Sequence, residues 1–428
     1  MRSLKPESGV LPHPDVQSLL DWISECRVRA DLRLTFLPLD RLPSWRMSER
    51  TLEHETGRFF SVVGASCTGQ GKDSPWGDQA LILQPEIGIL GFLTARIARE
   101  TVVLAQAKAE PGNIGTTQLA PTVQATESNF MRIHGGAATP FLEWFRDPNA
   151  PIASDTLQSE QGTRFLGKYN RNIMREVDLK STGNPGPLWR WVPWRILQKA
   201  LGLDFTVNTD ARSVIVCGDW ELLAGEDAAF QPESSPNEFG TLLHMSYRSD
   251  PDAGDLPIDR LLERLTAWRS AARQITTPKP ILGLEGWTFD AGSLVNRKEG
   301  VRYLGVGVRV NGREIPAWDQ PLFQHGPEGL VVLVCQVRQG LLHLLLSRRA
   351  EPGYREGVQF GPSLQTNAVE APRVPACQIQ SFLLSQLSSP ASVTRSSCLQ
   401  SDEGGRFFQS VTRYSLIQPC LSGSLPNN

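Results

Sequence analysis

The stretch QAKAEPGNIGTTQLAPTVQATESNF, residues 106–130, recurs in weaker form as SRRAEPGYREGVQFGPSLQTNAVE at residues 347–370. The motif AEPG is intact in both copies, and two polar anchors, Glu110 and Gln124, each precede their counterparts by 241 residues. Equal spacing of two anchors around an unchanged motif indicates an internal duplication. The chain is therefore predicted to consist of two related halves.

Further landmarks extend the repeat over most of the chain. Trp45 precedes its counterpart Trp287 by 242 residues, and SEQGTRF at residues 159–165 returns as SDEGGRF at residues 401–407. Each copy then has the size of an ordinary domain. We expect an N-terminal repeat, a proline-rich acidic linker and a C-terminal repeat, over residues 1–224, 225–257 and 258–428.

The composition is typical of a chain with two folded cores. The 428 residues are 40% hydrophobic and 21% charged, with a formal net charge of -2, so no basic excess points to nucleic acid or an anionic membrane. The seven cysteines form no CxxC pair, which favours free thiols in a reducing compartment, the cytoplasm, over a disulfide framework or a zinc site. No targeting segment and no long apolar run is present, so no membrane contact is expected.

The hydrophobic patterns of the two halves predict matching elements. Residues 16–29 and 258–273 have apolar side chains at helical spacing, so each half is predicted to begin with an amphipathic helix. Residues 58–67 and 301–310 are rich in β-branched and aromatic side chains and are predicted strands. Residues 79–112 are expected to form two apolar strands, neighbours in one sheet, and so are their counterparts in the second copy. Sheets flanked by helices place each half in the α+β or α/β class.

A polar stretch follows AEPG in the first half. Residues 115–130 are dense in Gln, Thr, Asn and Ser without being of low complexity. Such side chains can line a pocket, and the alternative is that they satisfy the backbone of a loop. Pro121 and Gln124 have identical counterparts in the second copy, which favours the pocket. The side chains expected to bind substrate from this stretch are Gln118, Thr122, Gln124 and Asn129.

A second polar block, SEQGTRFLGKYNRN, covers residues 159–172. On a helix, Arg164, Lys168 and Arg171 would share one face and could clamp a diphosphate. The alternative is a solvated face that pairs with nearby glutamates. Asn172, at the end of the block, is added to the expected binding set.

Several motifs in order resemble one known family. In the first half they are QAKAEPGN…QLAPTVQATESNF, QPEIGILGF, HETGRFFSV and SEQGTRF…NRN, and in the second REIPAWDQPL with AEPG…PSLQ. Over nearly the full length these resemble the NDP-hexose 2,3-dehydratases of deoxysugar and antibiotic biosynthesis. The resemblance implies two tandem Nudix-like α/β/α domains from gene duplication, a homodimer, and action on dTDP-4-keto-6-deoxyglucose. It also implies that one of two sugar-nucleotide pockets does chemistry while the other is a relic.

The implied reaction needs a base, a proton donor and an electrophile. The C4 ketone acidifies the C3 proton, the C2 hydroxyl leaves as water, and the enol becomes a 3,4-diketo sugar, so no cofactor and no metal is expected. Glu110 is the candidate base, because a carboxylate beside Pro111 at a strand end can be desolvated, which raises its pKa. Lys108 lies on the same strand face and is the candidate partner of the enolate oxygen. Arg349 replaces Lys108 in the second copy, which favours the first half as the working site.

Two further first-half side chains complete the expected site. His54 is a candidate proton donor, against the alternative of an exposed loop histidine. Trp45 can stack on thymine or pack in the core under the first helix, and core packing is the favoured alternative.

The second copy is expected to be degenerate and truncated. The counterpart of Leu188 would be residue 430, beyond the last residue of the sequence, and residues 415–428 are predicted to be unstructured. Ser410 stands opposite Lys168, so the second diphosphate clamp is expected to be thinner. The residues expected in a second pocket are Arg349, Glu351, Gln365, Arg406 and Arg413.

Two other functions are compatible with this pattern. A Nudix-type hydrolase of NDP-sugars would need a glutamate-rich REUxEE helix for magnesium, and no such run follows the strands. A non-catalytic sugar-nucleotide binding protein is the second alternative. In that protein the side chains of Lys108 and Glu110 would point into the core, away from a ligand.

Overall fold

The computed structural model describes residues 15–69, 76–126, 138–148, 150–224, 238–250, 252–254, 256–326, 328–366, 383, 389 and 392–419. Helices and mainly antiparallel sheets occur together in both halves, which confirms the α+β class. Over these residues, no helix has the length and the apolar run that a bilayer span requires.

The first half contains most of the helices. Its elements are α1 (Val16–Ala30), β1 (Arg33–Leu37), η2 (Leu39–Arg41), β2 (Trp45–Met47), β3 (Thr51–His54), β4 (Ser61–Thr68), β5 (Gly77–Leu83), β6 (Gly88–Ile97), β7 (Glu100–Ala109), β8 (Thr117–Ala120), β9 (Val123–Ala125), α3 (Leu142–Arg146), β10 (Ser154–Ser159), β11 (Tyr169–Glu176), η4 (Leu179–Thr182), β12 (Trp189–Pro193), α4 (Trp194–Leu201), α5 (Thr209–Val216) and α6 (Trp220–Ala224).

The remainder of the chain repeats the early part of this order. Its elements are α7 (Glu238–Arg248), α8 (Ile258–Ala271), β13 (Ile275–Lys279), η5 (Ile281–Gly283), β14 (Thr288–Asp290), β15 (Ser293–Asn296), β16 (Val301–Arg309), β17 (Ala317–His325), β18 (Gly329–Arg338), β19 (Leu341–Leu345), β20 (Ser347–Ala350), β21 (Val358–Gly361), β22 (Leu364–Thr366), β23 (Val393–Ser401) and β24 (Val411–Gln418).

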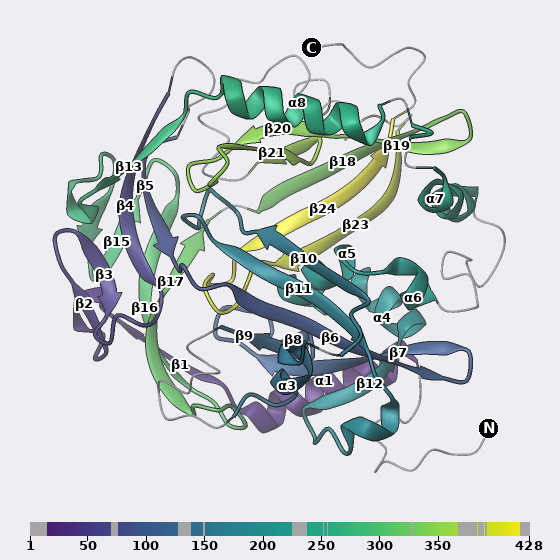
Figure 1. Cartoon of the computed structure of the whole chain (residues 1–428). Coiled ribbons are helices and arrows are strands. Elements are labelled where there is room, and N and C mark those ends of the chain that lie inside the picture. Colours follow the sequence, from purple (N-terminus) through teal and green to yellow (C-terminus); the bar gives the residue numbers. More distant parts are fainter. Residues whose placement is uncertain are drawn as a thin grey trace.

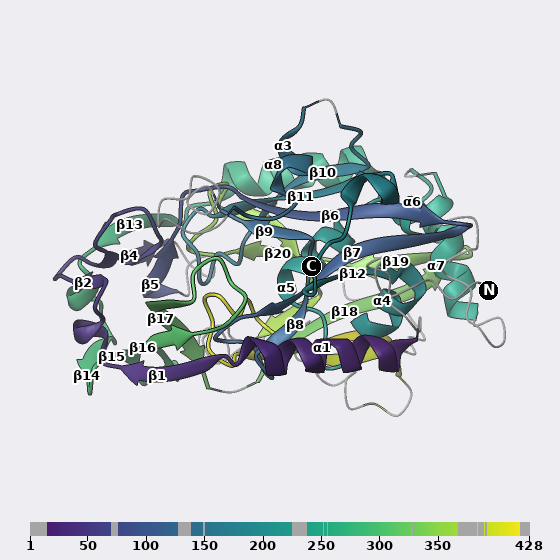
Figure 2. The ribbon, with the colours of Figure 1, turned by 90° about the horizontal axis from the view of Figure 1, so that it is seen from below.

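Both predicted amphipathic helices form. α1 begins after Asp15, whose carboxylate accepts the backbone N–H of Ser18 at 2.7 Å and so caps the helix. Its apolar stripe buries Leu19 and Ile23 against the sheet that contains β7 and β8. Figure 2 shows α1 running alongside β8. α8 has the same spacing, but none of its side chains is buried.

The two halves exchange their first strands. β1 of the first half pairs antiparallel with β16 of the second, and β13 of the second half pairs antiparallel with β4 of the first. Figure 1 shows both exchanged strands on the side of the molecule where β2–β5 and β14–β17 gather. We call these the shared sheets: one holds β1 and β14–β17, the other β2–β5 and β13. A boundary at residues 225–257 therefore divides the sequence repeat but not the shared sheets.

One hydrophobic core lies between the shared sheets. It takes Trp45, Phe60 and Phe165 from the first half and Trp287 and Tyr303, among others, from the second. Because each half supplies large side chains to the same core, the free energy that stabilises it depends on both halves together.

Each half also forms a sheet of its own. The first-half sheet has the order β10-β11-β6-β7-β12, with β11 parallel to β6. The second-half sheet has the order β23-β24-β18-β19, with β24 parallel to β18. These sheets occupy the other side of the molecule in Figure 1. The matching parallel pairs support the duplication read from the sequence.

The two AEPG turns interlock the halves. The backbone N–H of Gly112 donates to the carbonyl oxygen of Gly404 at 2.8 Å, and that of Gly353 donates to the carbonyl oxygen of Gly162 at 2.8 Å. A Cβ at either donor glycine would overlap a backbone carbonyl of the opposite half. Each AEPG turn is therefore seated against the SEQGTRF or SDEGGRF turn of the other copy.

The expectation of two neighbouring apolar strands in residues 79–112 is confirmed by β6 and β7, which pair in the first-half sheet. A further strand, β5, precedes them and pairs with β4 in a shared sheet. Pro85 lies between β5 and β6, where a residue without an N–H donor ends the pairing. The chain uses this break to pass from one sheet to the next.

The linker stays a prediction, and the predicted unstructured tail needs correction. The expected linker at residues 225–257 contains the helix α7, while residues 225–237 lie outside the described part of the chain. The expected unstructured tail begins inside β24, which runs parallel to β18 and covers residues 415–418. Alternation of apolar side chains over only a few residues gave too weak a signal for this strand.

Candidate active site

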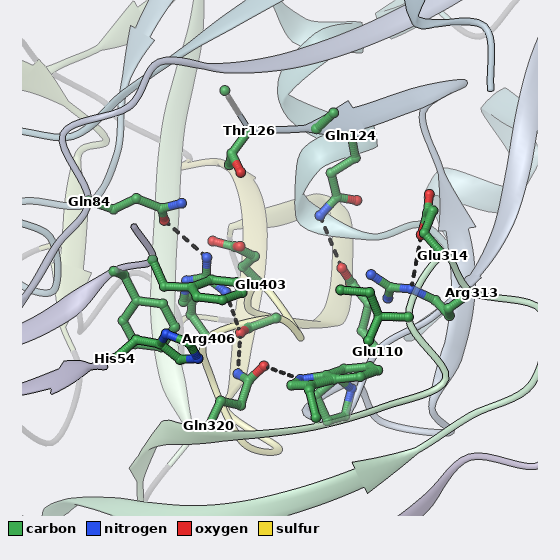
Figure 3. A pocket seen from close by; sticks show the side chains of 18 of the residues that line it. His54, Gln84, Glu110, Gln124, Thr126, Arg313, Glu314, Gln320, Glu403 and Arg406 are labelled. Carbon is green, nitrogen blue, oxygen red and sulfur yellow. Dashed lines mark hydrogen bonds and ion pairs between the residues drawn. The ribbon is translucent and has the colours of Figure 1, made fainter. Parts of the chain in front are cut away.

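A cavity of about 450 Å³ lies where the first-half sheet meets both shared sheets. Its wall contains Lys108, Glu110 and Gln124 from the first half and Glu403 and Arg406 from the second. Figure 3 shows Glu110 and Gln124 on one side of the cavity and Glu403 and Arg406 across from them. The cavity exists because the SDEGGRF turn of the second half is seated beside the first AEPG turn.

Glu110 is held at the end of β7 by two hydrogen-bond donors and one ion pair. Gln124 donates from Nε2 to Oε1 of Glu110 at 3.0 Å, and Asn113 donates from Nδ2 to Oε2 at 3.2 Å. The ammonium of Lys108 lies 3.7 Å from Oε1. These donors stabilise a buried carboxylate in one orientation toward the cavity. The prediction that Lys108 and Glu110 share one face is confirmed, because both line the cavity.

Lys108 is a buried cation in the same network. Burial lowers the pKa of its ammonium, and the neighbouring carboxylate of Glu110 acts in the opposite direction. Lys108 is 8% exposed and belongs to β7, where it pairs with Gln118 of β8. A sheet strand fixes the position of the charge better than a loop would.

Arg406 crosses the middle of the cavity from the second half. Its guanidinium lies 4.2 Å from the ring centroid of Phe60, and Nη2 donates to Oε1 of Gln84 at 3.1 Å. The sequence assigned Arg406 to a second pocket, and the structure corrects this by placing it in the cavity with Glu110. Arg406 lies there because the SDEGGRF turn that carries it is seated against the AEPG turn of the first half. A repeat in the sequence does not show which turn of one half contacts which turn of the other.

Three further carboxyl groups belong to the same network of buried charges, two of them in the cavity wall. Asp210 and Glu403 line the cavity, and Glu160 accepts a hydrogen bond from Nδ2 of Asn170 at 2.5 Å. Burial, followed by repulsion from neighbouring carboxylates, raises the pKa of Asp210 well above its ordinary value and that of Glu160 to about 7. Burial also raises the pKa of Glu403. The site therefore holds several acidic groups that keep their protons more tightly than in water.

The sequence reasoning missed Asp210, Glu403 and a third lining residue, Arg313. Arg313 donates from Nη1 to the carbonyl oxygen of Ala109 at 2.9 Å, beside Glu110. Asp210 follows the helix cap Asn208, and that capping pattern was the available signal. It predicts a helix start and carries no information about a cavity.

Aromatic side chains form the other end of the cavity. The ring of His54 lies 4.5 Å from that of Phe59 and 5.5 Å from that of Trp45, centroid to centroid. Nδ1 of His54 lies 2.9 Å from Oγ1 of Thr56, and burial lowers the pKa of the imidazole. Figure 3 shows His54 on the opposite side of the cavity from Glu110, with Arg406 between them.

Trp45 is in a core, but not the expected one. It packs with the shared-sheet core, whereas α1 packs in a separate cluster on the first-half sheet. Its Nε1 donates to the carbonyl oxygen of Asp319 at 2.9 Å, and its ring also lines the cavity. Trp45 therefore packs in a core and also lines the cavity, so each of the two expected positions is partly correct.

The expected helical clamp at residues 164–171 does not form. Arg164 lies in the turn before β11, with its guanidinium 4.5 Å from the ring centroid of Phe323. Lys168 lines the cavity and donates to the carbonyl oxygen of Glu86. Arg171 lies on β11 and pairs with Asp155 at 2.5 Å. Turn and strand geometry, in place of a helix, send these three cations to different surroundings.

Several other expected binding residues have structural partners. Gln118 donates to Oγ of Ser401 at 2.8 Å, and Thr122 accepts the backbone N–H of Leu93 at 2.9 Å. Asn172 is buried on β11. The cavity wall, taken over the described residues, does not include Arg164, Arg171, Gln118, Thr122 or Asn172. Asn129 lies outside the described residues.

The region around Glu351 differs from that around Glu110. Arg349 pairs with Glu351 at 2.7 Å, and the backbone N–H of Thr163 donates to the same carboxylate at 3.2 Å. Glu351 is 1% exposed. Gln365 lies on β22, and Arg413 pairs with Glu328 at 2.7 Å on the surface. Arginine thus fills the position beside the second carboxylate that lysine occupies at the cavity.

Comparison with known proteins gives one consistent result. The family model described as NDP-hexose 2,3-dehydratase matches residues 16–217 and 259–424. A dTDP-4-dehydro-6-deoxy-alpha-D-glucopyranose 2,3-dehydratase of Streptomyces violaceoruber is 33% identical over 92% of this chain and 86% of its own length. Proteins of the same name from Saccharopolyspora spinosa and Amycolatopsis orientalis are 29% and 30% identical, over 96% and 92% of this chain and 83% and 80% of their own lengths.

Proposed function

Because the chain belongs to the NDP-hexose 2,3-dehydratase family, we propose that it removes water across C2 and C3 of dTDP-4-keto-6-deoxyglucose. The reaction takes place in the cavity around Glu110. The observation that carries this proposal is the Glu110 carboxylate, oriented by Gln124 and Asn113 in a cavity whose opposite wall supplies Arg406. A fixed base and a fixed cation in one cavity suit an elimination next to a ketone.

Glu110 takes the C3 proton in this proposal. The electrons of the C3–H bond move toward the C4 carbonyl, so negative charge develops on its oxygen. Lys108, 3.7 Å from Glu110, stabilises that charge. Loss of the C2 hydroxyl as water then gives the enol, which becomes a 3,4-diketo-2,6-dideoxy sugar by tautomerisation.

The nucleotide occupies the arginine and aromatic end of the cavity. Arg406 and Lys168 supply positive charge for the diphosphate. The rings of Trp45 and His54 line a wall against which thymine can stack. A neutral His54 in this position acts on the base or the sugar by hydrogen bonding rather than as a charged group.

The first carboxylate is the working one. Glu110 faces a cavity with Lys108 and Lys168, whereas Glu351 is closed in by Arg349, and Ser410 stands at the position of Lys168. A carboxylate already paired with arginine at 2.7 Å has no free orientation for proton transfer.

The test uses purified protein and dTDP-4-keto-6-deoxyglucose. Mass spectrometry should find the intact nucleotide sugar with one water less, formed equally with and without a chelator. A Nudix-type hydrolase would instead release a nucleoside monophosphate and a sugar phosphate, in a reaction that the chelator stops. A sugar-nucleotide binding protein would bind the substrate and leave its mass unchanged. Either result would overturn the proposed function.

We also propose that each half is Nudix-like and that the protein is a homodimer. The repeated order of a helix followed by a mixed sheet supports the first proposal. Exposed apolar side chains support the second, since Leu262 on α8 is 55% exposed and Leu344 on β19 is 49% exposed. An experimental structure tests the first proposal, and light scattering of the purified protein, with a monomer mass as the contrary result, tests the second.

A further inference from the structure

Helix α5 is tied to the base by side-chain hydrogen bonds. Asn208 caps the helix by accepting the backbone N–H of Ala211 at 2.8 Å. Its Nδ2 donates to Oε1 of Gln124 at 3.3 Å, and Gln124 donates in turn to Glu110 at 3.0 Å. The start of α5 and the Glu110 carboxylate therefore hold a fixed relation to one another.

Asp210 lies in the first turn of α5 and lines the same cavity. It is 4% exposed, and the groups that act on its charge are Glu403, Glu110 and Glu160, against the one cation Lys108. The N-terminus of a helix favours a charged carboxylate. Burial, followed by repulsion from the three carboxyl groups, raises the pKa of Asp210 well above its ordinary value, so its protonated form is favoured more than in an exposed aspartate.

The other acidic groups are less suited to donate a proton at this point. Burial raises the pKa of Glu403 as well, but three cations, Arg406, Lys168 and Lys108, act in the opposite direction. On Asp210 the cation that acts in this way is Lys108. Glu160 is held by Asn170 and, among the described residues, is not part of the cavity wall. Glu110 accepts hydrogen bonds from Gln124 and Asn113, and such donors orient a carboxylate that acts as a base.

We propose that Asp210 is the catalytic acid that protonates the departing C2 hydroxyl, an assignment that rests on the proposed function. The C3–H bond breaks and its proton goes to Glu110, the C2–O bond breaks, and the oxygen leaves as water with the proton of Asp210. The product at this stage is the enol, Glu110 is protonated and Asp210 is ionised. Protonation of C2 by Glu110 and loss of the enol proton to Asp210 complete the tautomerisation and restore both groups, with no oxidant or reductant.

The test compares two leaving groups in Asp210→Asn. Fluoride departs as an anion without forming a bond to a proton, so the 2-deoxy-2-fluoro analogue of the substrate does not require an acid at C2. We expect Asp210→Asn to slow water loss by about 10²- to 10⁴-fold, the usual contribution of general acid catalysis. Fluoride release should fall by less than about tenfold. Glu110→Gln should lose both reactions, because both begin at the C3 proton.

Exchange of the C3 proton with deuterated water reports whether the variant site is intact. Asp210→Asn should still exchange this proton from the natural substrate, as followed by NMR, and should bind dTDP like the wild type. The matched control is Asp155→Asn, an aspartate paired with Arg171 outside the cavity wall, which should keep both reactions. Equal loss of water and fluoride release in an Asp210→Asn protein that still binds dTDP would refute the role of Asp210, as would full retention of water loss. If the wild type releases neither water nor fluoride, it is the proposed function that fails.

Discussion

The backbone N–H of Gly112 donates to the carbonyl oxygen of Gly404 across 2.8 Å, and this bond joins the base-bearing turn of one half to the cavity wall of the other. A Cβ at Gly112 would overlap the carbonyl oxygen of Phe407. The close approach therefore requires glycine. Gly353 makes the reverse contact with the carbonyl of Phe165, so the interlock is present twice.

Gly112→Ala should separate the two walls of the cavity. The added methyl meets backbone, which cannot rotate away, so we expect a loss of stability of about 1–3 kcal/mol or more, as for overpacked interiors. Activity should fall as well, because Glu110 lies two residues before the displaced turn. Urea unfolding and the rate of water loss measure the two effects.

Two other glycines serve as controls for this variant. Gly353→Ala should destabilise the protein to a similar extent but affect the rate less, since its turn carries Glu351. Gly283→Ala should change neither property, because its nearest neighbour would be a side-chain carbon of Pro280 at 3.7 Å. Equal stability of Gly112→Ala and the wild type would show that the interlock is not under steric constraint.

Arg406→Ala should weaken substrate binding. A charge-assisted hydrogen bond contributes roughly 1.5–3 kcal/mol, so KM should rise by about 10- to 100-fold. Arg171→Ala is the comparison, because its partner is Asp155 outside the cavity wall, and KM should change by less than about twofold. A larger rise in KM for Arg171→Ala than for Arg406→Ala would contradict the proposal that Arg406 binds the diphosphate. It would support the clamp of Arg164, Lys168 and Arg171 that was predicted from the sequence.

Local patterns in the sequence were sufficient for the parts of the fold that depend on neighbouring residues. The spacing of Leu19 and Ile23 predicted α1, and the two-residue spacing of Lys108 and Glu110 along a strand placed both on one face at the end of β7. The duplication was also readable, because it preserves distances along the chain. Six residues expected in the first-half site line the cavity: Lys108, Glu110, Gln124, Lys168, Trp45 and His54.

Contacts between the halves were not readable from the sequence. Pairing of β1 with β16 joins residues far apart in the chain, and no local pattern selects β16 over a strand of the same half. Arg406 was placed in the wrong pocket for that reason. Arg171 was misplaced because the prediction assumed helical spacing, in which every third or fourth residue shares a face. Residues 169–176 form the strand β11, where the side chains of Asn170 and Arg171 point to opposite faces.

Glu110→Gln and Glu351→Gln should fail in different ways. Loss of the base should reduce kcat by about 10²- to 10⁴-fold while the fold is retained. Glu351→Gln should instead remove the buried carboxylate of the ion pair with Arg349, which costs roughly 3 kcal/mol of stability. The two effects are separated by dividing each rate by the fraction of folded protein, which urea unfolding gives. Glu110→Gln should have a low rate per folded molecule, and Glu351→Gln should have a small folded fraction. A fall in kcat for Glu351→Gln alone would move the working site to the second half.

Glu160 should make stability depend on pH. Burial and then Glu403 raise the pKa of its carboxyl from 4.5 to about 7 in the folded protein. Between these values the folded state binds a proton that the unfolded state has released, so the stabilisation is complete below the lower value and is lost as pH rises through the upper one. The slope from one such group is at most about 1.4 kcal/mol per pH unit. Glu160→Gln should make the unfolding free energy decrease less steeply with pH over this interval. The pH dependence that comes from Asp210 and Glu403 should remain. Ser159→Ala is the control, because it removes a hydrogen bond to Gln359 but no titrating group. It should lower the unfolding free energy equally at every pH and leave its pH dependence unchanged. If Glu160→Gln also leaves the pH dependence unchanged, the carboxyl group of Glu160 does not titrate in this interval.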